Sequence, residues 1–459
     1  MKDLFLIRHA KSSWTDDSLR DMDRPLNKRG KRQVDAMAPA LLELGALDGP
    51  VHASHAFRAR QTIEKVMEQL PEHHLASRIH FDPELYTFRW KPLFKWLKHL
   101  DSEAPSVTVI GHNPALTDLA GFLTDGEVPE LATGAVMHLT VPITSWHQLV
   151  GGKAKLVHSL PPAEASYRLF RRKAPKAPEA SGDLQQQLPA ALHHQLATIR
   201  ALQPGVVQGM DTEFLHQYRV NLRRTRAVTE AITTITGEKA LRKAVKPLKR
   251  MAQQTSLLRD LDVFLLYLES QAAASPRLSR SLNASGALAF YRQWQAKERQ
   301  SLGRQMDSKA WHKALKQWQA TITGKALNRA LKKTTPAAIR NTVQQCVDNC
   351  LELFRGLSPQ AGDEAFHELR KALKRLRYLA ELDKWHYQAL LQELKDQQKL
   401  YGDFQDRHQQ LSLLASLAAT RRDQRLPPVL TELAQQLENE KQAARDAILA
   451  QPPRITGGQ

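Results

Sequence analysis

The segment MKDLFLIRHA, residues 1–10, decides the fold of the first part of this chain. Its four consecutive apolar residues, Leu4 to Ile7, have the unbroken hydrophobicity that is typical of a strand buried on both faces. Arg8 and His9 follow directly, where such a strand ends. Because ligands of open α/β sheets bind beyond the carboxyl ends of the strands, the segment predicts a sheet with a functional site at that edge.

Three further apolar runs are strand candidates, at residues 51–54, 107–110 and 137–141. Between them, residues 29–45 and 57–70 have apolar residues at helical spacing, and the first of these segments ends at Gly45, as helices commonly do. Strands that alternate with helices predict an α/β three-layer sandwich, with helices on both faces of a central sheet, over residues 1–165.

Polar side chains follow the ends of two other predicted strands. Arg58 comes after the second strand and His112 after the third, while Arg24 lies in a loop of the sequence Arg-Pro-Leu. With Arg8 and His9 they bring two imidazoles and two or three guanidinium groups to one edge of the sheet, which predicts an anionic ligand. Guanidinium groups fit phosphate oxygens in pairs, and a neutral imidazole can attack phosphorus and hold the phosphoryl group covalently.

This ordered set of residues resembles the histidine phosphatase superfamily, which has the phosphoglycerate-mutase-like fold, and in particular its short SixA-type phosphohistidine phosphatases. The resemblance implies that His9 is the nucleophile that becomes phosphorylated. It also implies that the phosphoryl oxygens are held by Arg8, Arg58 and His112, with Arg24 as a further phosphate contact. His55 stands where many members have proline, which we expect to alter the shape of the loop more than the chemistry.

The general acid is left open by the sequence. Larger members of the superfamily use a carboxylate, and Glu84 lies about where one is expected, so it is either the acid or an exposed loop glutamate. An imidazole or a phosphate leaves near neutral pH with little protonation. A site with a weak acid therefore suits phosphohistidine or phosphoanhydride substrates better than phosphoserine.

The charge of the chain is concentrated in its second part. The net charge is +19; residues 1–170 hold 20 Lys and Arg against 20 Asp and Glu, whereas residues 171–459 hold 46 against 27. An excess of this size indicates a polyanionic partner, although a merely solvated basic surface has a similar composition.

The sequence also indicates a compartment. Cys346 and Cys350 are too few for a disulfide framework or a zinc site, and they suit a reducing environment. No apolar run approaches the length that spans a bilayer, and residues 1–8 lack the apolar length of a signal peptide. We expect a cytoplasmic protein without membrane contact.

The second part of the chain predicts a helical bundle that contains an internal repeat. Residues 166–198, which include a Pro- and Ala-rich stretch, are expected to be a linker, and residues 199–452 are rich in Leu, Ala, Gln, Lys and Arg at helical spacing. His216 and its neighbours recur 151 residues later from His367, and Asp260 recurs 146 residues later as Asp406. Two copies of one helical unit are the simplest explanation.

Each copy carries a basic stripe. On a helix, His216, Arg223, Arg219 and Arg226 fall within about 80° of arc. The second copy repeats this stripe with His367, Arg370, Lys374 and Arg377. We expect no glutamate four residues away to neutralise these cations, so that a polyanion lies across them.

The stripes and the segments around Asp260 and Asp406 resemble the CHAD family of helical domains. The resemblance implies two pseudo-symmetric helical bundles around a basic cavity that binds inorganic polyphosphate. The implied anion ligands are His216, Arg219, Arg223, Arg226, His367, Arg370, Lys374 and Arg377, with Lys249 and Arg259 as weaker candidates. Gln405 and His408 depart from Arg259 and Asp262 of the first copy, so the two halves are not expected to contribute equally.

The leading hypothesis is a phosphohistidine phosphatase whose helical part binds polyphosphate and localises or regulates the enzyme, in association with polyphosphate granules. Neither domain shows a pattern that requires a metal or a cofactor. Three alternatives stay open: a phosphatase that trims polyphosphate itself, a basic nucleic-acid-binding protein with a vestigial enzyme domain, and a purely regulatory adaptor.

Overall fold

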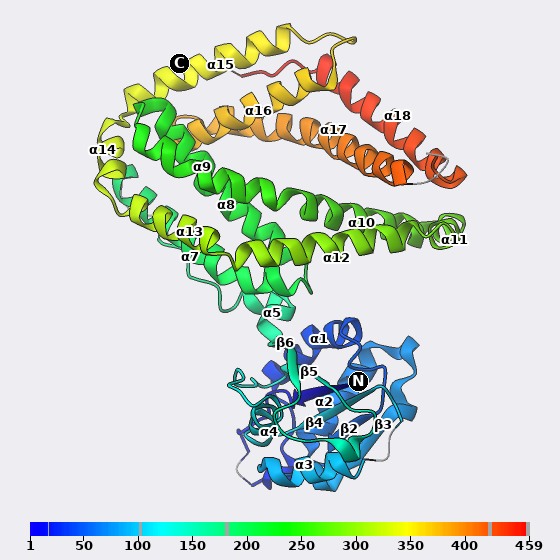
Figure 1. The fold of residues 1–459 in the computed structure, drawn as a ribbon. Coiled ribbons are helices and arrows are strands. Elements are labelled where there is room, and N and C mark those ends of the chain that lie inside the picture. Colours follow the sequence, from blue (N-terminus) through cyan, green and yellow to red (C-terminus); the bar gives the residue numbers. More distant parts are fainter. Residues whose placement is uncertain (17, 101–102, 180–182, 421–424, 456–459) are drawn as a thin grey trace. The chain divides into compact units, whose positions relative to one another are not determined.

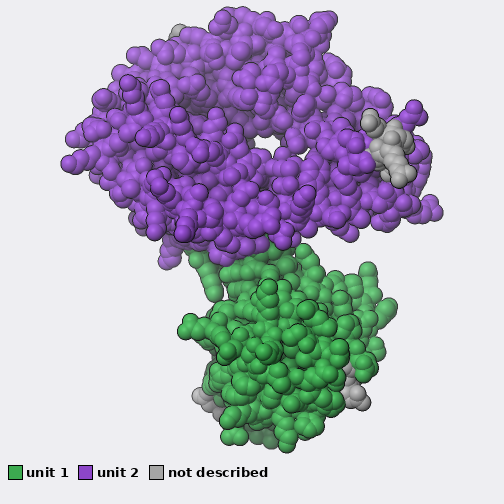
Figure 2. Space-filling model, viewed as in Figure 1, with its two compact units in different colours: residues 1–174, 208–214 green, residues 175–207, 215–459 purple. Residues whose placement is uncertain are grey.

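The computed structural model describes residues 1–459 except 17, 101–102, 180–182, 421–424 and 456–459. The chain divides into two compact units, which are coloured separately in Figure 2. Unit 1 contains residues 1–174 and 208–214, and unit 2 contains residues 175–207 and 215–459. The chain therefore passes from one unit to the other three times.

Unit 1 is built on a six-stranded mixed sheet with the strand order β3-β2-β4-β1-β5-β6. Its strands are β1 (Lys2–Arg8), β2 (Val51–Ser54), β3 (Ile79–Asp82), β4 (Ser106–Gly111), β5 (Val136–Val141) and β6 (Lys155–Leu160). The first four strands pair in parallel, and β5 and β6 are antiparallel. All four predicted strands are present. The edge strands β3 and β6 were not predicted, because their half-exposed residues lack an apolar run.

Helices cover both faces of this sheet, which confirms the predicted three-layer sandwich (Figure 1). One face packs against α1 (Lys28–Glu43) and α2 (Phe57–Gln69), and the other against α3 (Trp90–Lys98) and α4 (Ala115–Thr124). The central strand β1 serves both cores, since Phe5 and Ile7 point to the first and Leu4 and Leu6 to the second. Each of these side chains stabilises the unit by about 1.5–3 kcal/mol through burial.

The loop between β1 and α1 is fixed by the start of α1. The side chain of Asn27 accepts a hydrogen bond from the Gly30 amide and donates one to the carbonyl oxygen of Ser12. At Gly30 the helix passes so close to the loop that a Cβ atom would collide with the carbonyl oxygen of Lys11. The helix thus holds the segment that follows His9.

Unit 2 is helical throughout its described secondary structure. Its helices are α7 (Leu184–Gln208), α8 (Glu213–Thr236), α9 (Lys239–Gln254), α10 (Ser256–Ala274), α11 (Pro276–Ala284), α12 (Ala287–Met306), α13 (Lys309–Ile322), α14 (Lys325–Lys333), α15 (Pro336–Arg355), α16 (Asp363–Ala380), α17 (Gln388–Thr420) and α18 (Pro428–Ala450). Two short helices, α5 (Pro162–Ala165) and α6 (Tyr167–Phe170), end the first long segment of unit 1. Among the described residues, no helix is long and apolar enough to cross a membrane.

The segment expected to be a linker is shorter than predicted. Residues 184–198 belong to α7, whose buried positions Leu188, Leu192, Leu196 and Ile199 recur at helical spacing. Pro189 is the sixth residue of α7 and lies inside the helix, which therefore lacks one backbone hydrogen bond at this position. Because proline is rare inside helices, its presence led to the prediction of a linker in this segment.

The internal repeat is visible in the helices. The stripe at His216 lies on α8, and the equivalent stripe at His367 lies on α16. In the first copy, α9 and α10 are separated at Thr255, and Asp260 follows on α10. In the second copy a single long helix, α17, takes the place of both and carries Asp406.

Two apolar clusters join the copies. In one, residues of α8 pack with α15, α16 and α17; in the other, α10, α11 and α12 pack with α17 and α18. Figure 2 shows an opening through unit 2. Because the copies are joined in two separate places, unit 2 is closed around this opening.

Candidate active site and anion-binding site

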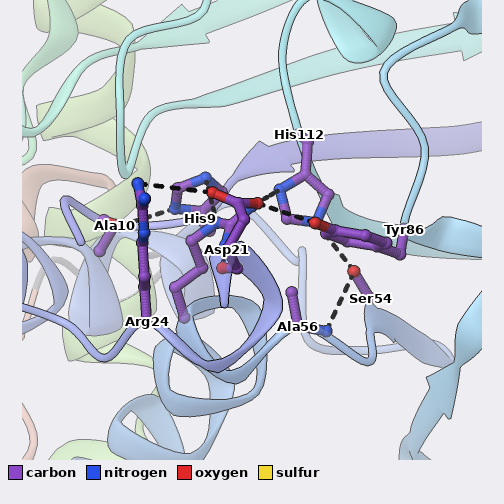
Figure 3. A network of polar contacts seen from close by, with 9 residues as sticks. His9, Ala10, Asp21, Arg24, Ser54, Ala56, Tyr86 and His112 are labelled. Atoms are coloured by element: carbon purple, nitrogen blue, oxygen red, sulfur yellow. Dashed lines mark hydrogen bonds and ion pairs between the residues drawn. The ribbon is translucent and has the colours of Figure 1, made fainter. Parts of the chain in front are cut away.

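Three buried side chains meet where β1, β2 and β4 end. His9 follows β1, Arg58 lies in the first turn of α2 behind β2, and His112 follows β4. Their exposed fractions are 9%, 4% and 1%. The rings of His9 and His112 are 5.0 Å apart between centroids, so the predicted pair of imidazoles is brought together (Figure 3).

The tautomer of His9 follows from its hydrogen bonds. Nδ1 lies 2.8 Å from the carbonyl oxygen of Ala10, which only accepts, so Nδ1 carries the proton. Nε2 therefore holds a lone pair and accepts a hydrogen bond from Nε of Arg58 at 3.1 Å. Burial, aided by the charges of Arg58 and Arg8, lowers the pKa of His9 to about 4, so the ring is neutral at pH 7.

His112 is oriented in the same way from the other side. Nη2 of Arg58 donates to Nδ1 of His112 at 3.4 Å, which leaves the ring proton on Nε2 for the hydroxyl of Ser54 at 2.8 Å. Ser54 in turn accepts a hydrogen bond from the Ala56 amide. Burial first, then His9 and Arg58, lower the pKa of His112 to about 3.

Asp21 is a site residue that the sequence analysis did not identify. It lies in the turn Asp21–Asp23, and its carboxylate accepts hydrogen bonds from Nη2 of Arg58 and from the hydroxyl of Tyr86, each at 2.8 Å. Nη1 of Arg24 lies 3.6 Å from its other oxygen. Burial raises the pKa of Asp21, but the Tyr86 and Arg58 hydrogen bonds and the nearby positive charges outweigh it and hold the pKa below its usual range. Its position three residues before Arg24 was the only signal in the sequence.

Arg8 and Arg24 bring further donors to the site. Arg8 donates through Nη1 to the carbonyl oxygen of Leu131 at 3.0 Å, and the guanidinium of Arg24 lies over the ring of Trp14, 3.6 Å from its centroid. Nε of Arg8, and Nε and Nη1 of Arg24, are buried and have no hydrogen-bond partner among the described residues. Such donors suit the oxygens of a phosphoryl group.

Glu84 is not brought into the site. It is exposed, and within the described part of the chain it forms no hydrogen bond or ion pair. Two residues later, Tyr86 enters instead, with its ring edge-on to His112 at 5.3 Å and its hydroxyl on Asp21. The turn Pro83–Leu85 buries Leu85 and so directs Glu84 to solvent. The geometry therefore favours the exposed loop glutamate over a general acid.

Substitution of Asp21 by asparagine is expected to tighten the binding of inorganic phosphate. The carboxylate accepts a hydrogen bond from Arg58, pairs with Nη1 of Arg24 at 3.6 Å and repels an incoming anion, whereas an amide keeps the shape without the charge. The inhibition constant of phosphate should fall by about 5- to 50-fold, as expected for removing one nearby charge. A rise in that constant would instead show that the charge of Asp21 is needed to hold Arg58 in place.

The second cluster lies in unit 2, where the stripes of α8 and α16 face each other. The charge of Arg223 on α8 acts on Arg370 and on Lys374 of α16, and Asp260 of α10 interacts with Asp406 of α17. Burial first, then the charges of Arg370 and Arg223, lower the pKa of Lys374 to about 7. The stripes predicted separately thus form one central cation cluster, defined here as Arg223, Arg370 and Lys374.

Several predicted anion ligands are engaged by the protein itself. Arg219 donates through Nη1 to the carbonyl oxygen of Ala252 and to the hydroxyls of Thr255 and Ser256, so it holds the break between α9 and α10. His367 is hydrogen-bonded to Gln405 at 2.7 Å. His216 is half-buried on α8, and Arg259 acts electrostatically on Arg219 and Asp260.

The expectation that no glutamate neutralises the stripes is wrong at their last positions. Arg226 pairs with Glu230 at 3.5 Å, and Arg377 pairs with Glu381 at 3.0 Å. The two pairs occupy equivalent positions in the two copies, so the sequence match between the copies extends to a position four residues beyond Arg226 and Arg377. Lys249 is exposed on α9, and nothing in the described part of the chain ties it to the central cation cluster.

Asp260 and Asp406 act electrostatically on the cations near the central cation cluster, Asp260 on Arg219 and Asp406 on Arg370. Burial raises the pKa of Asp260 to about 6, and Arg219 opposes the shift. Among the described residues, no group of three His, Cys, Asp or Glu side chains has the arrangement of a metal site. Tyr218 is fully buried, so its ring cannot stack on a nucleobase.

Comparison with known families agrees with the division of the chain into an α/β part and a helical part. Residues 4–91 match the histidine phosphatase superfamily (branch 1), and residues 190–415 match the CHAD domain. An uncharacterized chloroplastic protein of Arabidopsis thaliana is 32% identical over 133 residues, which are 27% of this chain and 60% of the plant protein.

Two solved structures are similar to the two parts. The protein histidine phosphatase SixA complexed with tungstate is 27% identical, with 36% of this chain and 99% of that chain covered and a TM-score of 0.31. The CHAD domain from the plant Ricinus communis is 19% identical, with 62% of this chain and 96% of that chain covered and a TM-score of 0.44.

Proposed function

We propose that this chain, which joins a histidine phosphatase superfamily domain of SixA-like fold to a largely helical CHAD domain, is a phosphohistidine phosphatase that also binds inorganic polyphosphate. The single observation that carries the enzymatic part is the state of His9. Its Nδ1 proton is fixed by the carbonyl oxygen of Ala10, so the lone pair of Nε2 faces the donors of Arg58. A neutral, oriented imidazole beside guanidinium groups is a nucleophile for phosphorus.

The reaction proceeds in two transfers. In the first, Nε2 of His9 bonds to phosphorus while the bond from phosphorus to the substrate imidazole breaks; that imidazole leaves with the electron pair and takes a proton from solvent. In the second, a water oxygen bonds to phosphorus, the bond to Nε2 breaks, and the water proton is lost to solvent. Arg8, Arg24 and Arg58 stabilise the negative oxygens in both transfers.

The site suits a leaving group that needs no strong acid. Asp21, which accepts hydrogen bonds from Arg58 and Tyr86 in the site, has a pKa held below its usual range and is ionised at pH 7, so it is a poor proton donor. The hydroxyl of Tyr86 is bonded to Asp21, and burial followed by that bond raises the pKa of Tyr86. Both features favour phosphohistidine over phosphoserine.

Phosphate release from matched peptides tests the enzymatic part. The full chain is given a phosphohistidine peptide, a phosphoserine peptide of the same sequence, or polyphosphate of defined length. We expect rapid release from the phosphohistidine peptide, at least about 100-fold slower release from phosphoserine, and no shortening of polyphosphate. Release from polyphosphate alone would make the polymer the substrate and overturn the proposal.

Polyphosphate binding is supported by the central cation cluster. Arg223 is exposed and has no hydrogen bond or ion pair among the described residues, and Nε of Arg370 is buried without a partner there. Cations of like sign held this close repel one another, and a chain of phosphates between them removes that cost.

Cys346 and Cys350 are free thiols, which supports a cytoplasmic location, with polyphosphate granules as the place of action.

Polyphosphate affinity is expected to fall as the pH rises through 7. Lys374 has a pKa of about 7 in the free protein, so it is charged below this pH and neutral above it. Bound phosphates favour the charged form, so binding takes up a proton, and affinity should drop roughly 10- to 30-fold between about pH 6.5 and pH 8.5. Titration calorimetry in two buffers measures the proton uptake directly.

The matched control for this pH dependence is Lys374→Arg, which keeps a charge at every pH. Its affinity should change much less over the same range. An unaltered slope in this variant would show that Lys374 is not the group that titrates.

A further inference from the structure

A cavity that has none of Arg223, Arg370 and Lys374 in its lining lies at the turn between α16 and α17. Its volume is about 550 Å³, and its lining includes Arg377 at the end of α16, Glu381 and Lys384 in the turn, and Lys395 on α17. Trp385 lies at the same turn, and the rest of the lining is formed by Gln388, Leu391 and Gln392 of α17. The mouth thus combines one indole with three cations and one carboxylate.

Trp385 is the distinctive feature of this cavity. Its exposed fraction is 93%, and it makes no ring or cation–π contact with the described residues, whereas its neighbour Tyr387 is buried. Single exposed apolar side chains are common on protein surfaces. An exposed indole at the edge of a cation-lined cavity is a different case, because one ligand can contact both parts.

The cations in the cavity leave a surplus of positive charge. Arg377 pairs with Glu381 and donates to Gln398 at 2.6 Å, so the one carboxylate is already neutralised. Lys384 and Lys395 are exposed, and neither has a hydrogen bond or ion pair within the described part of the chain. An anionic ligand therefore has two unpaired ammonium groups to bind.

The internal repeat shows that this cavity is specific to the second copy. Arg226, Glu230 and Lys249 of the first copy correspond to Arg377, Glu381 and Lys395. In the first copy, however, α8 continues to Thr236 and meets α9 after two residues, so no turn with a tryptophan exists there. The indole is present in one copy only, so it is not part of the repeated stripes, and it indicates a ligand with an aromatic part.

We propose that this cavity binds a nucleoside di- or triphosphate, with the base stacked on Trp385 and the phosphates on Lys384, Lys395 and Arg377. An exposed indole can stack on any nucleobase, because every base has a flat aromatic face. The phosphates supply the charge that the ammonium groups lack. An inorganic polyphosphate chain has no group that would contact the indole.

The test compares ATP with inorganic tripolyphosphate on the full-length protein by titration calorimetry at one salt concentration. In Trp385→Ala, ATP affinity should fall by about 5- to 150-fold, the range for one base stacked on an aromatic ring, while tripolyphosphate affinity stays unchanged. Trp385→Phe should retain part of the ATP affinity. Because Trp385 is exposed, neither variant is expected to change the melting temperature.

Charge variants complete the test. Lys384→Gln with Lys395→Gln should weaken ATP binding, whereas Lys399→Gln, an exposed lysine of α17 outside the cavity, should not. Equal ATP binding by wild type and Trp385→Ala would overturn the proposal. Binding of an oligonucleotide without binding of ATP would also overturn it, and neither result bears on His9 or on the central cation cluster.

Discussion

Replacement of His9 by alanine is expected to reduce phosphate release from a phosphohistidine peptide by on the order of 10⁴-fold or more, as removal of a covalent nucleophile does in other enzymes. The methyl group leaves Arg58 without the acceptor of its Nε proton and leaves phosphorus without an attacking atom. Rapid-quench experiments on the wild type should also trap a phosphorylated histidine, which the variant lacks.

The matched control is His55→Ala. His55 is exposed and lies three residues before Arg58, outside the network of His9. It should retain wild-type turnover and the trapped intermediate. Activity of His9→Ala above about a tenth of wild type would exclude His9 as the covalent nucleophile.

The triple substitution of Arg223, Arg370 and Lys374 by glutamine is expected to lower polyphosphate affinity by roughly 10³-fold or more. Each charge-assisted hydrogen bond contributes about 1.5–3 kcal/mol, and three of them are lost together. Binding should also become less dependent on salt, since fewer counterions are released. Fluorescence anisotropy of an end-labelled polyphosphate chain over a salt series measures both effects.

A control with the same change of charge is available on another helix. Lys309, Lys313 and Lys316 are exposed on α13, outside the central cation cluster. Their replacement by glutamine should change affinity only slightly. Equal losses in the two triple variants would mean that the polymer responds to net charge alone and not to the central cation cluster.

The sequence predicted the layers of unit 1 because its central strands are apolar on both sides. Leu4 to Ile7 are fully buried against two cores, and such runs have no other stable environment in a soluble domain. The edge strands β3 and β6 are half-exposed, and their mixed residues fit a loop as well as a strand. Pairing with a neighbour, and not local pattern, makes them strands.

The site was predicted where each residue follows a strand, and missed where a turn decides. His9, Arg58 and His112 are placed by three strand ends. Whether Glu84 or Tyr86 enters the site depends on the short turn at Pro83, and the position of Asp21 depends on its bonds to Arg58 and Tyr86. The contacts of Asp21 with Arg58 and Tyr86 join residues far apart in the sequence, so no local spacing could indicate them.

The contacts of the basic stripes also could not be predicted from local spacing in the sequence. Helical geometry placed Arg223 and Lys374 on stripes of two separate helices, but only the tertiary structure brings the two stripes together. Burial, followed by the charges of Arg370 and Arg223, lowers the pKa of Lys374. The glutamates at 230 and 381 lay one turn beyond the residues considered, and they pair with the last arginine of each stripe.

The three passages of the chain between the units have a consequence for biosynthesis. Residues 208–214 return to unit 1. There the carboxylate of Asp211 accepts a hydrogen bond from the backbone amide of Tyr167, and the ring of Phe214 packs on that of Phe170. Unit 1 therefore cannot complete its core when residue 174 leaves the ribosome. Residues 175–214 must be synthesised first, and about 40 residues take roughly 2–8 s of translation. During that interval the nascent chain exposes the surfaces of Tyr167 and Phe170 that residues 208–214 later contact.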